Sequence, residues 1–355
     1  MTAVVALRDA GVGCGTKART LGRLLSAGLV VPDGVVVPDP GAPGWRDELP
    51  DRLRALGGGT FAVRSSAAAE DSADASWAGQ LRTLLGVPAD QVDQAVREVA
   101  TTDARGAAYA IALGVPRPDG VAVLVQPMLT PVAAGVAFTR HPVTGEGTTV
   151  VEVVPGLGDR LVSGEEEPER WFSGIDGSVR LDAGRGVLVA HQARAVAAVA
   201  EHVERVLGGP QDVEWAIDAG GLVQTLQARP VTARGVAVPR LTDVGSGALL
   251  GVGTPAAAGA ARGRVRVLRS LDDLNSFRPG DVLVCRATSP AWTPVLARAA
   301  AVVTEVGGVL SHAAIVAREL GVPAVTGVAG AREMPDGALV VVDGSVGTVR
   351  AVTAS

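Results

Sequence analysis

The sequence predicts a protein of mixed architecture, α/β and α+β, in which two domains follow one another along the chain. Its 355 residues, 47% of them hydrophobic, are enough for two or three domains that each bury a core. Strand-like apolar runs alternate with helical stretches, and one intervening segment is rich in Gly, Ala, Pro and Val with little periodicity. We therefore expect a first domain over 1–233, a flexible linker over 234–258 and a second domain over 259–355.

Charge and cysteine content exclude several classes of protein. The net charge is −5 and the basic residues form no cluster, which argues against nucleic acid or an anionic membrane as a partner. No apolar run approaches the length of a membrane span, and the N-terminus lacks the pattern of a signal peptide. Two cysteines, Cys14 and Cys285, are too few for a disulfide framework. The sequence thus predicts a cytoplasmic protein with no nucleic acid and no membrane as partner.

The first domain begins with a glycine-rich loop, a helix and a turn over residues 11–34, where Gly28 ends the helix. Strands follow at "TFAVRSSA" and "VAVLVQPML", and "GVAFTRHPVTG" predicts a strand that leads into a turn. The stretch "HQARAVAAVAEHVERVLGG" predicts an amphipathic helix. The stretch "QDVEWAIDAGGLVQTLQARPVT" predicts a hairpin whose tip is Ala219-Gly220-Gly221.

The second domain has the pattern of a small α/β unit. We expect strands at "GRVRVL", "DVLVCRAT", "AVVTEV" and "PAVTGV", and a closing hairpin at "ALVVVDGSVGTVRAV". A helix between the third and fourth strands begins after Ser311, which can cap it, and ends at Gly321 and Pro323. The unit lies within the usual size range of a domain.

His312 lies in the first turn of that helix, four residues after the paired glycines Gly307 and Gly308 in the sequence "GGVLSH". A helix N-terminus disfavours imidazolium and favours an anion such as a phosphoryl group on the ring. Glycines would let a phosphate approach the backbone. Taken alone, the residue could equally be a structural histidine. A metal site is disfavoured because no second His or Cys lies at ligand spacing.

Lys17 is the single lysine among 32 basic residues. Arginine therefore supplies surface charge elsewhere, and a compact ammonium in a glycine-rich loop is typical of a phosphate contact. The alternative is one lysine without a special role.

The histidine stretch, with Thr304, Gly307-Gly308, Ser311-His312, Ala317-Arg318-Glu319, Gly321, Pro323 and the upstream "SPAWTPV", closely resembles the phosphohistidine (swivelling) domain of the phosphoenolpyruvate-utilising enzymes. These enzymes include phosphoenolpyruvate synthase, pyruvate phosphate dikinase and rifampin phosphotransferase. Segments from "GTKARTLGRLLSAGLVVPDG" to "QDVEWAIDAGGLVQTLQARPVT" resemble the nucleotide-binding domain of the same family, which is ATP-grasp-like. The resemblance implies an ATP-grasp-like domain followed by a small swivelling phosphohistidine β/β/α domain.

By the same resemblance, His312 would carry the phosphoryl group, and other residues would bind ATP and Mg²⁺. Lys17, Arg64 and Arg229 would contact phosphates, and Gln126 would lie at the strand that reads the adenine edge. Gly79 and Thr83 match the lid that presents amides and a hydroxyl to phosphate. Glu214 and Gln227 match the magnesium ligands, and oxygen donors suit that hard cation.

Plainer interpretations remain for single residues. Arg64 and Arg229 could be solvated strand arginines, and Glu214 a surface carboxylate. His141 stands where the family usually has Asp or Asn before a proline, so it would touch an acceptor or merely form the turn. Gly15-Thr16 replaces paired glycines of the family, which leaves the geometry of that loop open.

The resemblance implies an ATP-dependent phosphotransferase of dikinase type, in which the β-phosphate of ATP passes through phospho-His312 to an acceptor while AMP and phosphate are released. The linker is far too short to contain the phosphoenolpyruvate/pyruvate barrel of the larger relatives, which needs about 250 residues. The acceptor, expected to be a small metabolite, is therefore not named by the sequence. Two alternatives are a phosphohistidine-forming subunit whose acceptor site lies on a partner protein, and a non-catalytic nucleotide-binding regulatory module.

Overall fold

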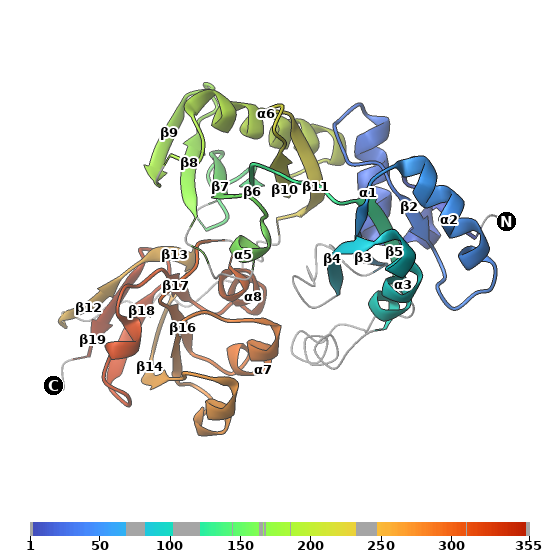
Figure 1. The fold of residues 1–355 in the computed structure, drawn as a ribbon. Coiled ribbons are helices and arrows are strands. Elements are labelled where there is room, and N and C mark those ends of the chain that lie inside the picture. Colours follow the sequence, from blue (N-terminus) through green and yellow to red (C-terminus); the bar gives the residue numbers. More distant parts are fainter. Residues whose placement is uncertain are drawn as a thin grey trace.

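The computed structural model describes residues 3–68, 82–101, 121–143, 145–162, 166, 168–184, 186–231, 247–309 and 311–352. Their strands form three sheets of five, six and eight strands (Figure 1). The first two sheets belong to the N-terminal domain and the third to a separate C-terminal unit. Within these ranges no helix has the length and apolar character needed to cross a membrane.

The five-stranded sheet is antiparallel and has the order β1-β2-β5-β3-β4. Helices α2 and α3 pack on one face through a cluster that includes Trp45, Phe61 and Val96. Helix α1 contacts both β3 and β11, so it joins this sheet to the next. The elements are β1 (Val5–Ala6), α1 (Gly15–Ser26), β2 (Val35–Val37), α2 (Trp45–Leu56), β3 (Thr60–Ala67), β4 (Thr83–Pro88), α3 (Val92–Ala100) and β5 (Val121–Pro127).

The six-stranded sheet is also antiparallel, in the order β11-β10-β6-β7-β8-β9. Helix α6 covers one face, where its alanines and valines pack against Trp171 and Trp215. The predicted hairpin forms, and Asp218 Oδ1 accepts from the amides of Gly220 and Leu222 at its tip. The elements are β6 (Ala133–Phe138), β7 (Thr149–Pro155), α5 (Asp159–Val162), β8 (Glu169–Ser173), β9 (Val179–Ala183), α6 (Ala190–Leu207), β10 (Gln211–Ile217) and β11 (Val223–Pro230).

The C-terminal unit contains the eight-stranded sheet, in the order β12-β19-β18-β14-β15-β16-β17-β13. The four strands from β14 to β17 run parallel, and α8 packs beside β13 and β17. The elements are β12 (Leu249–Val252), β13 (Thr254–Ala257), β14 (Ala260–Val267), β15 (Val282–Cys285), α7 (Thr293–Leu296), β16 (Ala301–Thr304), α8 (His312–Leu320), β17 (Ala324–Thr326), β18 (Leu339–Asp343) and β19 (Thr348–Ala351).

The prediction that residues up to 258 form a flexible linker is wrong for its second half. Residues 249–257 form β12 and β13, which pair with β19 and β17. Glycines and a proline weaken the strand signal there, but Gly251 and Gly253 leave no room for a Cβ because Val328 and the carbonyl of Thr326 approach them. The small residues therefore reflect close packing at the sheet edges.

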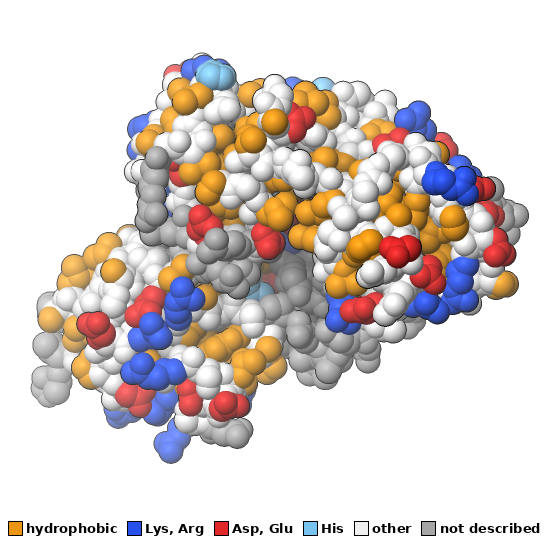
Figure 2. Space-filling view, in the orientation of Figure 1, with side chains coloured by type: hydrophobic (Ala, Val, Ile, Leu, Met, Phe, Trp, Pro, Cys, Tyr) orange, Lys and Arg blue, Asp and Glu red, His pale blue; other side chains and the backbone are white. Residues whose placement is uncertain are grey.

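The second face of the six-stranded sheet, opposite α6, meets the C-terminal unit. Val309 packs in one apolar cluster with Val136, Phe138 and Val150 of this face and Leu161 of α5. Accordingly, α8 lies on the side of the C-terminal unit nearest to this sheet (Figure 1). Figure 2 shows the C-terminal unit and the N-terminal domain as two lobes of the surface that meet along this side.

Candidate active site

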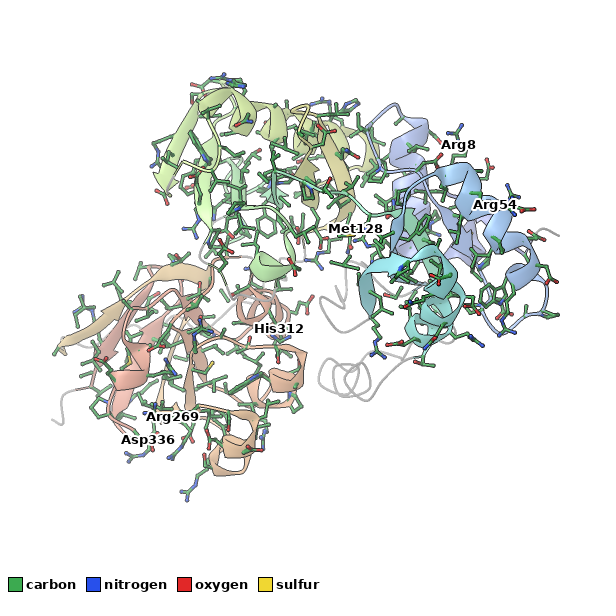
Figure 3. The ribbon with its side chains drawn as sticks, viewed as in Figure 1. Arg8, Arg54, Met128, Arg269, His312 and Asp336 are labelled. Atoms are coloured by element: carbon green, nitrogen blue, oxygen red, sulfur yellow. The ribbon has the colours of Figure 1, made fainter. Side chains whose placement is uncertain are left out.

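His312 is the first residue of α8, and its side chain is 5% exposed. Ser311 Oγ accepts from the amide of Ala314 at 3.4 Å, and Gly321 ends the helix in the left-handed region. The predicted cap and end of this helix are thus confirmed. Figure 3 shows His312 on the side of the C-terminal unit that faces the N-terminal domain. The ring is buried because most residues of α8 are buried.

Burial lowers the pKa of His312 to about 4. From the sequence we expect the helix dipole to keep the ring neutral. In the structure the cause is instead the loss of water around the imidazole. A neutral imidazole retains the lone pair that a nucleophile needs. The ring is therefore unprotonated at neutral pH and suited to accept a phosphoryl group.

Thr288 is a site residue that sequence analysis missed. Its Oγ1 lies 2.9 Å from His312 Nδ1, and the side chain is buried. Thr288 immediately precedes the segment "SPAWTPV", which resembles the family. Its place beside that segment was the one sequence feature that could have identified it as a site residue. When the hydroxyl accepts from Nδ1–H, the lone pair lies on Nε2. Thr288 can thus select the nitrogen that attacks.

Arg64 joins the two N-terminal sheets at the predicted nucleotide site. From β3, its Nη2 donates to Gln227 Oε1 at 2.9 Å and lies 3.6 Å from Glu214 Oε2. Its Nη1 donates to the carbonyl of Leu226 at 2.6 Å. Glu214 and Gln227 are direct cross-strand partners on β10 and β11, so they share one face. The structure therefore brings three of the predicted residues together.

The same geometry tests whether Glu214 and Gln227 could hold magnesium. Their side-chain oxygens converge on a single positive group, the Arg64 guanidinium. Two oxygen donors on one face fit Mg²⁺, which keeps water and phosphate oxygens in its other positions. Within the described ranges no three His, Cys, Asp or Glu side chains gather as a metal site. The pair fits a magnesium ion that is shared with a phosphate-bearing ligand.

Lys17 lies in the first turn of α1 and is 4% exposed. Its Nζ donates to the carbonyl of Ser65 at 3.0 Å, one residue from Arg64 along β3. Gly15 adopts φ +75°, and a Cβ there would lie 1.9 Å from the carbonyl oxygen of Ser66. The loop therefore requires glycine at position 15, where it presses against β3, while position 16 accommodates Thr16, whose hydroxyl donates to the Ala68 carbonyl.

Arg229 lies on β11 two residues after Gln227, and its Nε donates to Asp212 Oδ2 at 2.8 Å. Asp212, which sequence analysis missed, is 5% exposed and pairs directly with Arg229 across the strands. Burial raises the pKa of Asp212, and the Arg229 charge opposes that rise. The sequence could have identified Asp212, because it lies two residues before Glu214 on β10 and the two side chains therefore share a face.

The remaining predicted residues are placed unevenly. Thr83 is exposed on β4 directly opposite Arg64, so the two share a face. Gln126 is buried, and its amide is engaged by protein groups. Its Nε2 donates to the Pro32 carbonyl at 2.7 Å, and its Oε1 lies 3.5 Å from Arg64. Gly79 lies outside the described residues.

His141 forms part of a turn after β6. Its Nδ1 accepts from the amide of Val143 at 3.3 Å, and its carbonyl accepts from the amide of Gly145. The ring stacks on Phe172 with centroids 6.1 Å apart, and burial lowers its pKa. These contacts favour the turn-forming interpretation over contact with an acceptor.

Two antiparallel sheets that enclose a cluster of cationic and amide side chains, followed by a small unit with a buried histidine at a helix start, define an ATP-grasp-like protein with a phosphohistidine domain. The sequence comparisons agree. Residues 46–179 and 175–240 match the pyruvate phosphate dikinase AMP/ATP-binding domain. Residues 277–347 match the mobile domain of the PEP-utilising enzymes. The chain therefore belongs to the family of phosphoenolpyruvate-utilising enzymes, as its resemblance predicts, and its first domain is an ATP-binding domain.

Curated relatives support the same family. The chain is 37% identical to a probable phosphoenolpyruvate synthase of Archaeoglobus fulgidus, over 81% of this chain and 43% of that protein. It is 36% identical to a probable phosphoenolpyruvate synthase of Methanothermobacter thermautotrophicus, over 81% of this chain and 46% of that protein. The chain thus spans less than half the length of these relatives. Among solved structures, a D-alanine–D-alanine ligase of Bacillus anthracis matches 62% of this chain and 58% of that chain at 10% identity, with a TM-score of only 0.34.

Proposed function

We propose that the chain is an ATP-dependent phosphotransferase of dikinase type, in which His312 takes the β-phosphoryl group of ATP and passes it to a second acceptor. The observation that carries this proposal is the shared face of the six-stranded sheet. Strands β10 and β11 hold Glu214 and Gln227 with Arg64, and the neighbouring strands β6 and β7 pack against Val309, three residues before His312. The nucleotide cluster, by which we mean Arg64, Asp212, Glu214, Gln227 and Arg229, and the segment that leads into His312 therefore lie on one face of this sheet.

The first half-reaction follows from the proposed products. Nε2 of His312 attacks the β-phosphorus, the bond between the α-phosphate bridging oxygen and the β-phosphorus breaks, and AMP leaves. Transfer of the γ-phosphoryl group to water then releases phosphate and leaves phospho-His312. Lys17, Arg64 and Arg229 would stabilise the transferring charge, because each carries a cation within or beside the cluster.

Magnesium, held by Glu214 and Gln227, would neutralise charge on the polyphosphate. For these oxygens to receive it, Arg64 has to leave the position between them and turn to the phosphates. Thr288 would hold Nδ1 of His312, so that the ring plane stays fixed while Nε2 reacts. Burial keeps water from competing with the nucleophile.

The acceptor is proposed to be a small molecule, in a cytoplasmic setting. The curated relatives are named phosphoenolpyruvate synthases, so pyruvate is the first acceptor to test. A second candidate is a phosphohistidine-forming subunit that serves an acceptor site on a partner protein. The observation that favours it is that the chain matches less than half the length of those relatives.

ATP labelled separately at the β and γ positions tests the first half-reaction. We expect acid-labile label at His312 from the β position, release of γ label as phosphate, and no protein label in His312→Ala. Label that persists in His312→Ala would reject the proposal. AMP formation stimulated by pyruvate, with no second protein present, would assign the acceptor to this chain. AMP formation only after a partner protein is added would favour the subunit.

A further inference from the structure

The face of the six-stranded sheet that meets the C-terminal unit is continuous with the nucleotide cluster. One row of cross-strand partners runs through Arg170, Glu152, Val136, Glu214 and Gln227, and the next through Phe172, Val150, Phe138, Asp212 and Arg229. Cross-strand partners point to the same side of a sheet. Groups that touch the C-terminal unit therefore lie in the same two rows as groups of the nucleotide site.

Gly308 contacts the first row. A Cβ at Gly308 would lie 2.6 Å and 2.8 Å from the two carboxylate oxygens of Glu152. Glu152 is fully buried, and Arg170 fixes its Oε1 through Nε at 2.9 Å and Nη2 at 2.7 Å. Gly308 has no left-handed φ, so the Glu152 carboxylate of the other domain explains why a side chain does not fit there.

Arg318 of α8 contacts the second row. Its guanidinium lies 5.7 Å from the centre of the Phe138 ring, a cation–π distance. Its Nη1 donates to the carbonyls of Val309 and Ala256 at 2.7 Å and 2.9 Å, which orients the guanidinium within its own unit. Phe138 and Asp212 are cross-strand partners, so the guanidinium lies over the edge of the nucleotide cluster.

The charges around Arg318 are complementary. Desolvation lowers its pKa to about 10, and the carboxylates of Asp212, Glu319 and Glu152 oppose that shift while Arg229 adds to it. Asp212 accepts from Arg229 Nε at 2.8 Å, and its cross-strand partner Phe138 lies under the Arg318 guanidinium. One buried carboxylate thus lies in the field of two arginines, one from each domain.

We propose that Arg318 is a positioning residue for phosphoryl transfer to His312. Arg318 holds α8 against the part of the six-stranded sheet that carries Phe138 and Asp212, and so links docking of the C-terminal unit to the state of the nucleotide site. The inference rests on the proposed function. When Arg229 turns from Asp212 toward nucleotide phosphates, Asp212 loses its 2.8 Å partner, and Arg318, which lies over the cross-strand neighbour Phe138, is the cation of the other domain that compensates it. Nucleotide binding should therefore strengthen docking, and Arg318 should transmit the effect.

The first experiment compares two phosphoryl donors on the full chain. ATP requires docking, whereas phosphoramidate is a small donor that phosphorylates histidine directly. In Arg318→Met, we expect the ATP-dependent labelling rate at His312 to fall about tenfold, because a small misplacement of the nucleophile slows transfer. Because docking and nucleotide binding strengthen each other reciprocally, the Kd for ATP should rise by the same factor by which ATP strengthens docking in the wild type. Labelling by phosphoramidate should persist or accelerate.

Arg264→Met is the matched control. Arg264 is exposed on β14, and its Nη1 donates to the carbonyl of Gly337 at 3.1 Å. That carbonyl adjoins Asp336, which lies at the end of the unit away from His312 (Figure 3). We expect wild-type labelling from both donors. Equal loss from both donors in Arg318→Met would indicate a local structural role for Arg318 and overturn the inference.

The second experiment uses the Gly308 contact. Gly308→Ala should slow ATP-dependent labelling because its methyl group meets Glu152 only when the domains are docked. Glu152→Asp withdraws the carboxylate by one methylene, so we expect the double variant Gly308→Ala/Glu152→Asp to recover part of the rate. A strain confined to the glycine loop would not respond to Glu152, and the absence of recovery would count against the docking surface.

Small-angle X-ray scattering separates the two proposals. Arg318→Met and Gly308→Ala should each increase the radius of gyration, and ATP should compact the wild type more than Arg318→Met. If ATP does not label the wild type but both variants still expand, the proposed function fails and the docking role stands. Unchanged scattering in both variants overturns the docking role, whatever the labelling shows.

Discussion

The nucleotide cluster and the histidine site are built in opposite ways. In the cluster, charged groups from distant segments compensate one another: Arg64 contacts Gln227 and Glu214, and Arg229 contacts Asp212. At His312 the environment excludes charge, and burial alone lowers the pKa of the ring. The difference teaches that the cluster keeps its charges through mutual compensation, whereas the histidine is kept neutral by burial; the proposed function requires the first to exchange partners and the second to stay unprotonated.

The largest expected effect comes from breaking the compensation in the cluster. Arg64→Met removes the cation shared by Gln227 and Glu214, and we expect ATP-dependent labelling of His312 to fall about a thousandfold, as for arginines that stabilise transferring phosphate. Arg97→Met, which removes an exposed ion pair with Asp93 on α3, is the control and should be silent. Comparable losses in both variants would show that the effect is not specific to the cluster.

Acid should affect the histidine site next. The pKa of His312 is about 4 in the folded chain, against an ordinary value of 6.5, so the unfolded chain takes up a proton first as pH falls. The stabilisation is complete above pH 6.5 and is lost between pH 6.5 and pH 4, by about 3 kcal/mol. Urea unfolding at several pH values measures this loss. His312→Gln should lose less stability over the same interval, and identical curves would contradict the role of burial.

Thr288 tests the comparison between the two sites, because its uncharged hydroxyl contacts the His312 ring where the nucleotide cluster would use a charged group. Thr288→Val should reduce the labelling rate about tenfold through loss of ring orientation, with the Kd for ATP unchanged. Thr288→Ser keeps the hydroxyl and should retain most of the rate. If valine and serine variants behave alike, the hydroxyl does not orient the imidazole.

The smallest expected effect concerns the helix that carries the histidine. Ser311 Oγ accepts from the amide of Ala314 and donates to the carbonyl of Gly308. Ser311→Ala should lower the free energy of unfolding by about 1 kcal/mol, as for other helix caps. Thermal unfolding measures this change, and Ser311→Asp, which can still accept from the amide, should recover part of it.

Local patterns predicted local structure well. The limits of α8 follow from Ser311 and Gly321, and the hairpin tip follows from its glycines. Long-range pairing was less accessible. Residues 249–257 lack a strand pattern, yet they form strands because β19 and β17 supply partners distant in the chain.

The site was predicted unevenly for the same reason. The resemblance identified Arg64, Glu214 and Gln227 separately, and only the fold shows that Arg64 spans two sheets to reach the other two. Thr288 and Asp212 were missed because their roles depend on His312 and Arg229, which pack against them only in the folded chain. Burial of His312 likewise depends on tertiary packing that no local pattern encodes.

The path by which the chain enters the C-terminal unit has a mechanical consequence. β12 and β13 form the two opposite edges of the eight-stranded sheet, yet only Gly253 separates them in sequence. A force applied at residue 247 therefore acts first on the β12–β19 ladder and reaches the β13–β17 ladder through Gly253. Separating residues 249–257 from the unit therefore requires both ladders to break, one at each edge of the sheet.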